Sequence, residues 1–120
     1  MVKNTKNTMQ YSNGKIKEKL VNLGYLNIHL FPHSRFSKDY HIEGCDFDAF
    51  GWREGEKTIS FFQFKTNKKP SKEILQKYKY LEKKLNIKCL WVEYRKKEGV
   101  FFYNKNSINN KKTRIIPIEV

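Results

Sequence analysis

The feature that most constrains the fold is a pair of short strand-like runs, residues 45–52 and 58–65. The connection between them, residues 53–57, carries a glycine and several charges, as hairpin connections often do. Side chains in a strand alternate between the two faces of a sheet, so each run can bury one face and expose the other. The sequence therefore predicts two antiparallel neighbouring strands in the middle of the chain.

A helix and a strand are expected before this pair. The helix should begin at a cap on Ser12 or Asn13 and stop at Gly24, with an apolar stripe at three- and four-residue spacing: Ile16, Leu20 and Leu23. Residues 1–11 are polar and without periodic apolar positions, and we expect them to be flexible. Residues 25–31 alternate, with one side formed by Leu26, Ile28 and Leu30, which predicts a half-buried strand.

A second helix and two further strands should follow the pair. Ser71 is a good N-cap, Asn86 closes the helix, and the apolar face is formed by Ile74, Leu75, Tyr78, Leu81 and Leu85. Strands are predicted at 88–94 and 99–103, and the tail could add an edge strand. The order αβββαββ predicts a single α/β domain over residues 1–120, with a mixed central sheet flanked by helices and a βαβ crossover after residue 65.

Polar side chains interrupt the two central strands at matching positions. Period-two geometry puts Asp46 and Asp48 on one face, with Phe47 and Ala49 on the other, and it puts Gln63 and Lys65 on one face of the next strand. Hard oxygen ligands hold Mg²⁺ or Mn²⁺, such an ion activates water, and an ammonium group stabilises developing negative charge. In this hypothesis the ion is bound by the Asp46 carboxylate, the Gln63 amide oxygen and the Phe64 carbonyl, and Lys65 orients or helps to deprotonate the attacking water.

These two segments resemble a known family of nucleases. Gly44-Cys45-Asp46-Phe47-Asp48-Ala49 is similar to the G-x-D-x-x-A strand, and Gln63-Phe64-Lys65 to the (D/E)-x-K strand, of the PD-(D/E)XK superfamily. That superfamily includes archaeal-type Holliday junction resolvases and Mrr-like endonucleases, some of which carry Q-x-K. The resemblance implies a restriction-endonuclease-like αβββαβ core and metal-dependent cleavage of DNA. It also implies a catalytic Glu18 on the first helix and a catalytic Ser34, or Ser37, in the loop before Asp46.

The net charge indicates a polyanionic partner. The chain has 25 Lys and Arg against 12 Asp and Glu, a formal charge of +13, and such an excess favours phosphate contacts. We expect DNA to contact Arg35 and Lys38 beside the serines, and Lys68 and Lys69 before the second helix. Membrane binding is disfavoured by the lack of a long apolar run.

Other expectations concern assembly, location and competing functions. Cleavage of a four-way junction needs two symmetric cuts, so a resolvase would be a homodimer. Cys45 and Cys89 fit reduced, buried thiols of a cytoplasmic protein. One alternative is a DNA-binding module on a nuclease scaffold with weak or lost catalysis. It is suggested by Gln63, which stands where most members of the superfamily have an acid. Another is an RNA-binding or structural protein with an unrelated α+β fold, which predicts Asp46 and Lys65 far apart in space. Taken alone, Asp46 and Asp48 could also be ordinary solvent-facing strand residues.

Overall fold

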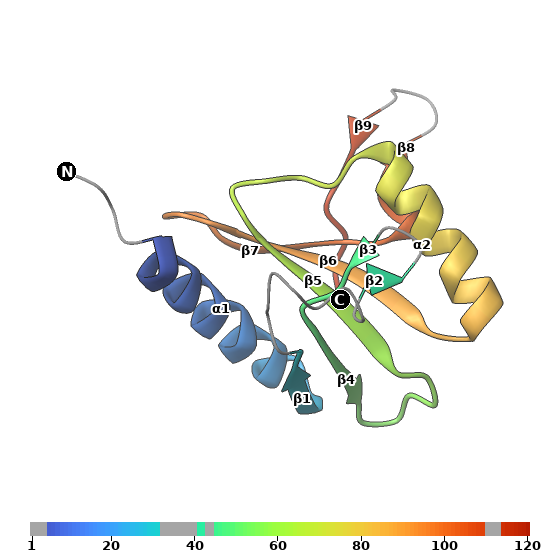
Figure 1. Ribbon diagram of the computed structural model, residues 1–120, viewed down its shortest axis with the longest axis horizontal. Coiled ribbons are helices and arrows are strands. Elements are labelled where there is room, and N and C mark those ends of the chain that lie inside the picture. Colours follow the sequence, from blue (N-terminus) through green and yellow to red (C-terminus); the bar gives the residue numbers. More distant parts are fainter. Residues whose placement is uncertain (1–4, 32–40, 43–44, 110–113) are drawn as a thin grey trace.

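The computed structural model describes residues 5–31, 41–42, 45–109 and 114–120 (Figure 1). Within these residues the chain order is α1 (Thr5–Asn22), β1 (Tyr25–Leu30), β2 (His41–Ile42), β3 (Cys45–Asp46), β4 (Ala49–Arg53), β5 (Ser60–Thr66), α2 (Lys72–Leu85), β6 (Lys88–Arg95), β7 (Gly99–Tyr103), the 3₁₀ helix η1 (Lys105–Ser107), β8 (Ile108–Asn109) and β9 (Arg114–Ile115). Neither α-helix of this described part is long and apolar enough to cross a membrane.

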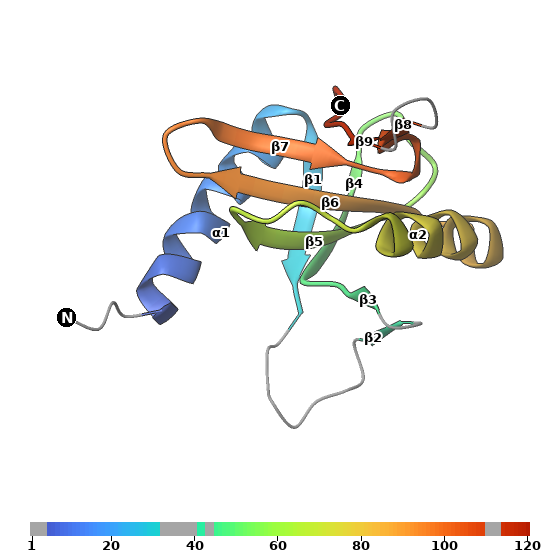
Figure 2. The ribbon, with the colours of Figure 1, turned by 90° about the horizontal axis from the view of Figure 1, so that it is seen from above.

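A mixed sheet of five strands, in the order β1-β4-β5-β6-β7, confirms the predicted α/β class (Figure 2). The hairpin prediction is confirmed, because β4 pairs antiparallel with β5 and Ala49 lies opposite Phe62. The crossover prediction is confirmed too, because β5 and β6 are parallel on either side of α2. Figure 2 also shows the short β2–β3 pair set off from the main sheet.

The two helices cover opposite faces of the sheet (Figure 1). The core on the α1 face includes Ile16, Leu20, Phe62, Phe64, Val92 and Phe102. The core on the α2 face includes Cys45, Phe47, Leu75, Tyr78, Leu81, Trp91 and Tyr103. Because both faces are covered, β5 and β6 are buried along most of their length, and polar residues in them need partners inside the protein.

Helix α1 begins earlier than the sequence predicts. The expected cap at Ser12 or Asn13 is wrong, because the helix already begins at Thr5 and runs through both residues. Adding a residue to an existing helix costs far less than nucleating one, so polar residues continue a helix whose later turns are packed. Those later turns carry Ile16 and Leu20, both fully buried. Residues 1–4 of the segment expected to be flexible lie outside the described residues.

Strand β1 is present where expected, but its simple alternation is wrong. The register with β4 shifts between Leu26 and His29, and Asn27 has a positive φ of 50°. This irregularity puts Tyr25 in the α1-face core and packs Ile28 against the same core, while Leu26 is 45% exposed. A bulge adds one residue to one strand and thereby reverses the faces that follow it.

The strand expected at 45–52 is divided into β3 and β4, with a break at Phe47 and Asp48. Phe47 joins the core under α2, whereas Ala49 joins the core under α1. The prediction that Phe47 and Ala49 share one face is therefore wrong. Beyond the break, β3 pairs with β2 and lies on the α2 side of the sheet (Figure 1).

Helix α2 and the last strands follow the predictions closely. The Ser71 side chain accepts a hydrogen bond from the Ile74 amide, and Asn86 ends the helix in the left-handed conformation. Of the expected apolar face, Leu75, Tyr78 and Leu81 are buried. The tail adds a single bridge from Ile118 to Phe102 and the β8–β9 pair, in place of one edge strand.

Candidate functional site

The polar residues of the two motif segments lie where β4 and β5 separate. We call this region the strand fork and define it as Asp46 and Asp48 on one chain segment and Gln63, Phe64 and Lys65 on the other. The Asp48 amide still donates to the Phe62 carbonyl, at 2.8 Å. The next ladder position is taken by a side chain, because the Phe64 amide donates to Asp48 Oδ2 at 2.7 Å. The carboxylate of Asp48 thereby ends the pairing and turns the preceding chain away.

Asp46 is the exposed acid of the strand fork. It lies in β3 between Cys45 and Phe47, which are both buried in the α2-face core. Two residues of extended chain span at most about 7 Å, so its Cα lies within that distance of the Asp48 Cα. The structure thus keeps both aspartates at the fork, with Asp48 bound to a backbone amide and Asp46 open to solvent.

Gln63 is buried, with only 4% of its surface exposed. Its Oε1 accepts a hydrogen bond from the Tyr78 hydroxyl at 2.5 Å, from the inner face of α2. Burial raises the pKa of Tyr78 well above its ordinary value, and the neighbouring Cys45, Cys89 and Asp48 raise it further. The phenol therefore remains a donor, and it orients the Gln63 amide with its oxygen toward α2. Because a carbonyl oxygen has two lone pairs, any metal bound by Gln63 would share this oxygen with Tyr78.

Lys65 is half-buried on the α2 face, at the end of β5. Its Nζ lies 6.0 Å from the centroid of the Trp91 ring. The indole Nε1 of Trp91 donates to the Lys68 carbonyl at 2.9 Å, which ties the loop after β5 to the same place. Lys68 and Lys69 are exposed in that loop, so the predicted DNA-contacting lysines and Lys65 gather at one end of the sheet.

The donor atoms at the strand fork suit a hard divalent cation. Magnesium usually keeps several waters and takes one or two carboxylates from the protein, and Asp46 and Asp48 offer two beside the Gln63 amide. Among the described residues no group of three or more His, Cys, Asp or Glu could hold a metal ion. A site here would thus depend on amide or carbonyl oxygen and on water for its remaining ligands.

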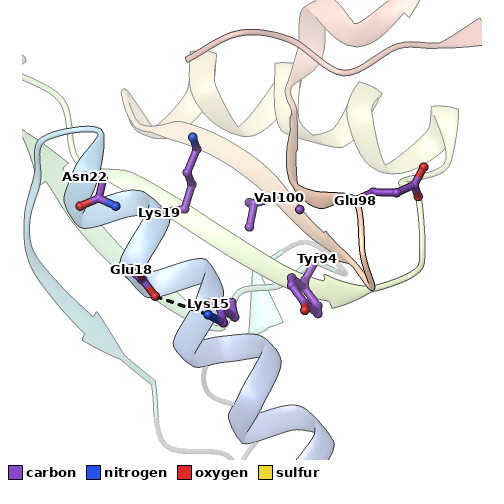
Figure 3. A pocket seen from close by; sticks show the side chains of 8 residues that line it. Lys15, Glu18, Lys19, Asn22, Tyr94, Glu98 and Val100 are labelled. Atoms are coloured by element: carbon purple, nitrogen blue, oxygen red, sulfur yellow. Dashed lines mark ion pairs between the residues drawn. The ribbon is translucent and has the colours of Figure 1, made fainter.

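Glu18 is carried by α1, on the other face of the sheet from Gln63. It is exposed on α1 and pairs with Lys15 at 4.0 Å. Both side chains line a pocket with Tyr94 and Glu98 from the β6–β7 hairpin (Figure 3). That hairpin is separated from β4 by β5 in the sheet order. Helix α1 covers one face of the sheet, whereas the Gln63 side chain bonds Tyr78 of α2 on the other face.

Several predicted residues fall outside the described part of the chain. Ser34, Ser37, Arg35 and Lys38 all belong to residues 32–40. Their proposed contacts with the scissile phosphate and the DNA backbone stay predictions.

Sequence reasoning missed the role of Tyr78 and of a buried acid, Glu93. Tyr78 was counted only as part of the apolar face of its helix, yet its hydroxyl is the partner of Gln63. Glu93 is 3% exposed and accepts hydrogen bonds from Arg95 and Tyr103. The available signal was the same for both, namely one polar atom within an otherwise apolar run that must find a partner when buried.

Neither a scan against protein-family models nor a search of curated proteins finds a match to the chain.

Proposed function

We propose that the protein is a metal-dependent endonuclease that hydrolyses phosphodiester bonds of DNA. The observation that carries the proposal is the strand fork, where two aspartates from one segment meet Gln63 and Lys65 of the next. The α-β-β-β-α-β order that the motif resemblance implies is supported by the mixed sheet with a helix on each face.

The proposed roles follow from the positions of these groups. Asp46, the Gln63 amide and the Phe64 carbonyl would hold Mg²⁺ or Mn²⁺, with Asp48 as a further acid beside them. Such an ion, when bound, lowers the pKa of a coordinated water and stabilises charge on the phosphate. Lys65 would orient the attacking water and stabilise the negative charge that develops on the phosphate.

DNA is the proposed substrate because the chain carries a net charge of +13 and exposes Lys68 and Lys69 beside Lys65. Cleavage of a Holliday junction would require a homodimer, which would supply two strand forks related by a two-fold axis. A cytoplasmic location is in keeping with Cys45 and Cys89, which are both free thiols and buried.

A second candidate is a DNA-binding module in which catalysis is weak or lost. It is favoured by the burial of Gln63 and by the hydrogen bond that its oxygen already accepts from Tyr78. An amide carries no charge, so a metal site with Gln63 in place of an acid is weaker unless Asp48 compensates. This candidate predicts salt-dependent DNA binding without metal-dependent cleavage.

Cleavage of branched and linear DNA in the presence of Mg²⁺ or Mn²⁺ tests the proposal. The purified protein should cut, and Lys65→Ala should lower the rate by about 100-fold or more, in line with the loss of one transition-state charge contact. Lys57→Ala is the matched control, since Lys57 is exposed in the turn at the opposite end of β5. Cutting that survives Lys65→Ala would refute the proposed catalysis, and binding without cutting by the unaltered protein would favour the second candidate.

A further inference from the structure

A buried triad of polar side chains lies beside the strand fork, on β6 and β7. Glu93 Oε1 accepts hydrogen bonds from Arg95 Nε and from the Tyr103 hydroxyl, each at 2.9 Å. The remaining side is closed by Arg95 Nη2, which donates to the Tyr103 hydroxyl at 2.7 Å. Glu93 and Tyr103 are 3% and 0% exposed, so this acid and this phenol lie inside the protein. The arginine is the member of the triad that reaches solvent, with 21% of its side chain exposed.

The Arg95 guanidinium is held in one orientation. Its Cζ lies 4.0 Å from the centroid of the Phe101 ring, close enough for the planar group to stack on the ring. Of the five N–H groups of a guanidinium, two are used by Glu93 and Tyr103. Within the described residues, three therefore remain for an oxygen ligand, in a fork that matches phosphate geometry. An arginine fixed in advance loses little side-chain entropy when it binds.

The sheet register puts Arg95 next to Lys65. Lys65 is the Cα partner of Glu93 on the neighbouring parallel strand. Arg95 follows Glu93 by two residues and so projects from the same face as Lys65. With about 4.8 Å between strands and about 3.3 Å per residue, the Cα atoms of Lys65 and Arg95 lie about 8 Å apart. Both are on the α2 face, because Lys65 lies over Trp91 and Arg95 bonds Tyr103 of that core.

The loop that carries Lys68 borders the same surface. The Asn67 amide donates to the Tyr94 carbonyl at 2.9 Å, and the Asn67 side chain accepts from the Lys96 amide at 3.3 Å. These bonds connect the loop after β5 with the turn after β6. Lys68 and Lys96 are both exposed there, so the two connections next to Lys65 and Arg95 carry further cations.

From this arrangement we infer that Arg95 is a phosphate-binding residue, and that a phosphodiester backbone passes from the strand fork across Lys65 to Arg95. The identity of that backbone as DNA rests on the proposed function. Arg95 contacts a phosphate next to the one at the fork, and Glu93, Tyr103 and Phe101 hold its guanidinium in place. Arg95 thus belongs to substrate binding and not to the chemical step.

Binding of a DNA duplex in the presence of a metal chelator tests the inference, because it requires no cleavage. Fluorescence anisotropy should show that Arg95→Gln binds about tenfold more weakly, as expected for one lost charge-assisted contact. The slope of log affinity against log salt should become shallower by about 0.9, the value for one lost phosphate contact. Arg53→Gln is a close control, since Arg53 lies 5.7 Å from the Tyr25 ring at the other end of the sheet and loses the same charge. The affinity of Arg53→Gln for DNA should differ from that of the unaltered protein by less than twofold, because Arg53 is not placed to contact a phosphate of the bound backbone.

Two further variants test whether binding depends on the shape and orientation of the guanidinium, and not only on its positive charge or on correct folding. Arg95→Lys retains a cation to pair with Glu93, so the fold survives, yet it should still bind several-fold more weakly because an ammonium lacks the planar fork. Tyr103→Phe leaves the net charge unchanged and should also weaken binding, because it frees one edge of the guanidinium. Thermal melts of each variant verify that the protein is folded.

The possible results give distinct answers. Equal binding by Arg95→Gln and Arg53→Gln would overturn the inference while leaving cleavage at the strand fork standing. Binding that depends on Arg95, by a protein that never cuts DNA, would support the inference and reject the nuclease. Absence of DNA binding by the unaltered protein would overturn both.

Discussion

Tyr78→Phe is the substitution whose effect the structure specifies most closely. It removes one oxygen atom and no carbon, so it leaves the ring stacked near Phe47 in the core under α2. The lost hydroxyl is the donor to Gln63 Oε1, and both residues are buried. The amide oxygen then remains in the interior without its described partner, which costs about 1–3 kcal/mol of folding free energy.

Urea unfolding and thermal melts measure this cost. In a chain of this length each kcal/mol lowers the melting temperature by roughly 3–6 °C, so the variant should melt at least about 3 °C lower. The matched control is Tyr80→Phe, the same chemical change two residues further along α2. Tyr80 is 52% exposed, so removal of its hydroxyl leaves no buried polar group without a partner. The free energy of unfolding should therefore change by less than about 0.5 kcal/mol.

A double-mutant cycle with Gln63→Met identifies the partner. Methionine has nearly the shape of glutamine without its polar end, and alone it leaves the Tyr78 hydroxyl unpaired. Replacing both partners with apolar groups of similar shape should cost less than the sum of the two single changes, by about 1–3 kcal/mol. Strict additivity, or a Tyr78→Phe effect as small as that of Tyr80→Phe, would refute the view that this hydrogen bond holds Gln63.

Three other outcomes are expected. Gln63→Glu should tighten Mn²⁺ binding measured by calorimetry, because a carboxylate in that place adds a charged ligand; unchanged affinity would remove Gln63 from the metal site. Burial and the bond to Glu93 raise the pKa of Tyr103 to about 12. The folded state then retains the Tyr103 proton more strongly than the unfolded chain does. This contribution to the free energy of unfolding is complete below about pH 10 and is lost as the pH rises toward about 12. Urea titrations should therefore show that the stability of Tyr103→Phe falls less at alkaline pH than that of the unaltered protein. Burial also raises the pKa of the Cys89 thiol far above its usual range. A thiol-specific reagent should therefore label Cys89 and Cys45, which is also buried, only after unfolding. Rapid labelling of the native protein would contradict the packing of this core.

Local patterns in the sequence were sufficient for the elements that make up most of the sheet and its second helix. Ser71 and Asn86 mark the ends of α2 through their own side-chain and backbone preferences. The alternation in β5 correctly divides Phe62 and Phe64 from Gln63, because nothing interrupts that strand. The parallel crossover to β6 followed from a strand, a helix and another strand in succession.

The strand fork illustrates what local patterns could not decide. From the sequence, the alternation of faces should continue through Asp48. In the structure, the Asp48 carboxylate accepts the hydrogen bond from the amide of Phe64, 16 residues away, in place of a backbone carbonyl. That contact lies just before β4, and Phe47 and Ala49 on either side of Asp48 enter opposite cores. The irregularity at Asn27 has a similar effect on β1, where a shifted register reverses the side that faces the core.

The sequence by itself determined the residue types available for chemistry, the length and caps of α2, and the faces of the uninterrupted strand β5. Only the tertiary structure decided that Gln63 is buried under Tyr78 and that Arg95 is held by Glu93 and Tyr103. The physical reason is that periodicity and capping arise from neighbours within a few residues. The partner of a buried polar group, in contrast, depends on which distant segments the packed cores bring together.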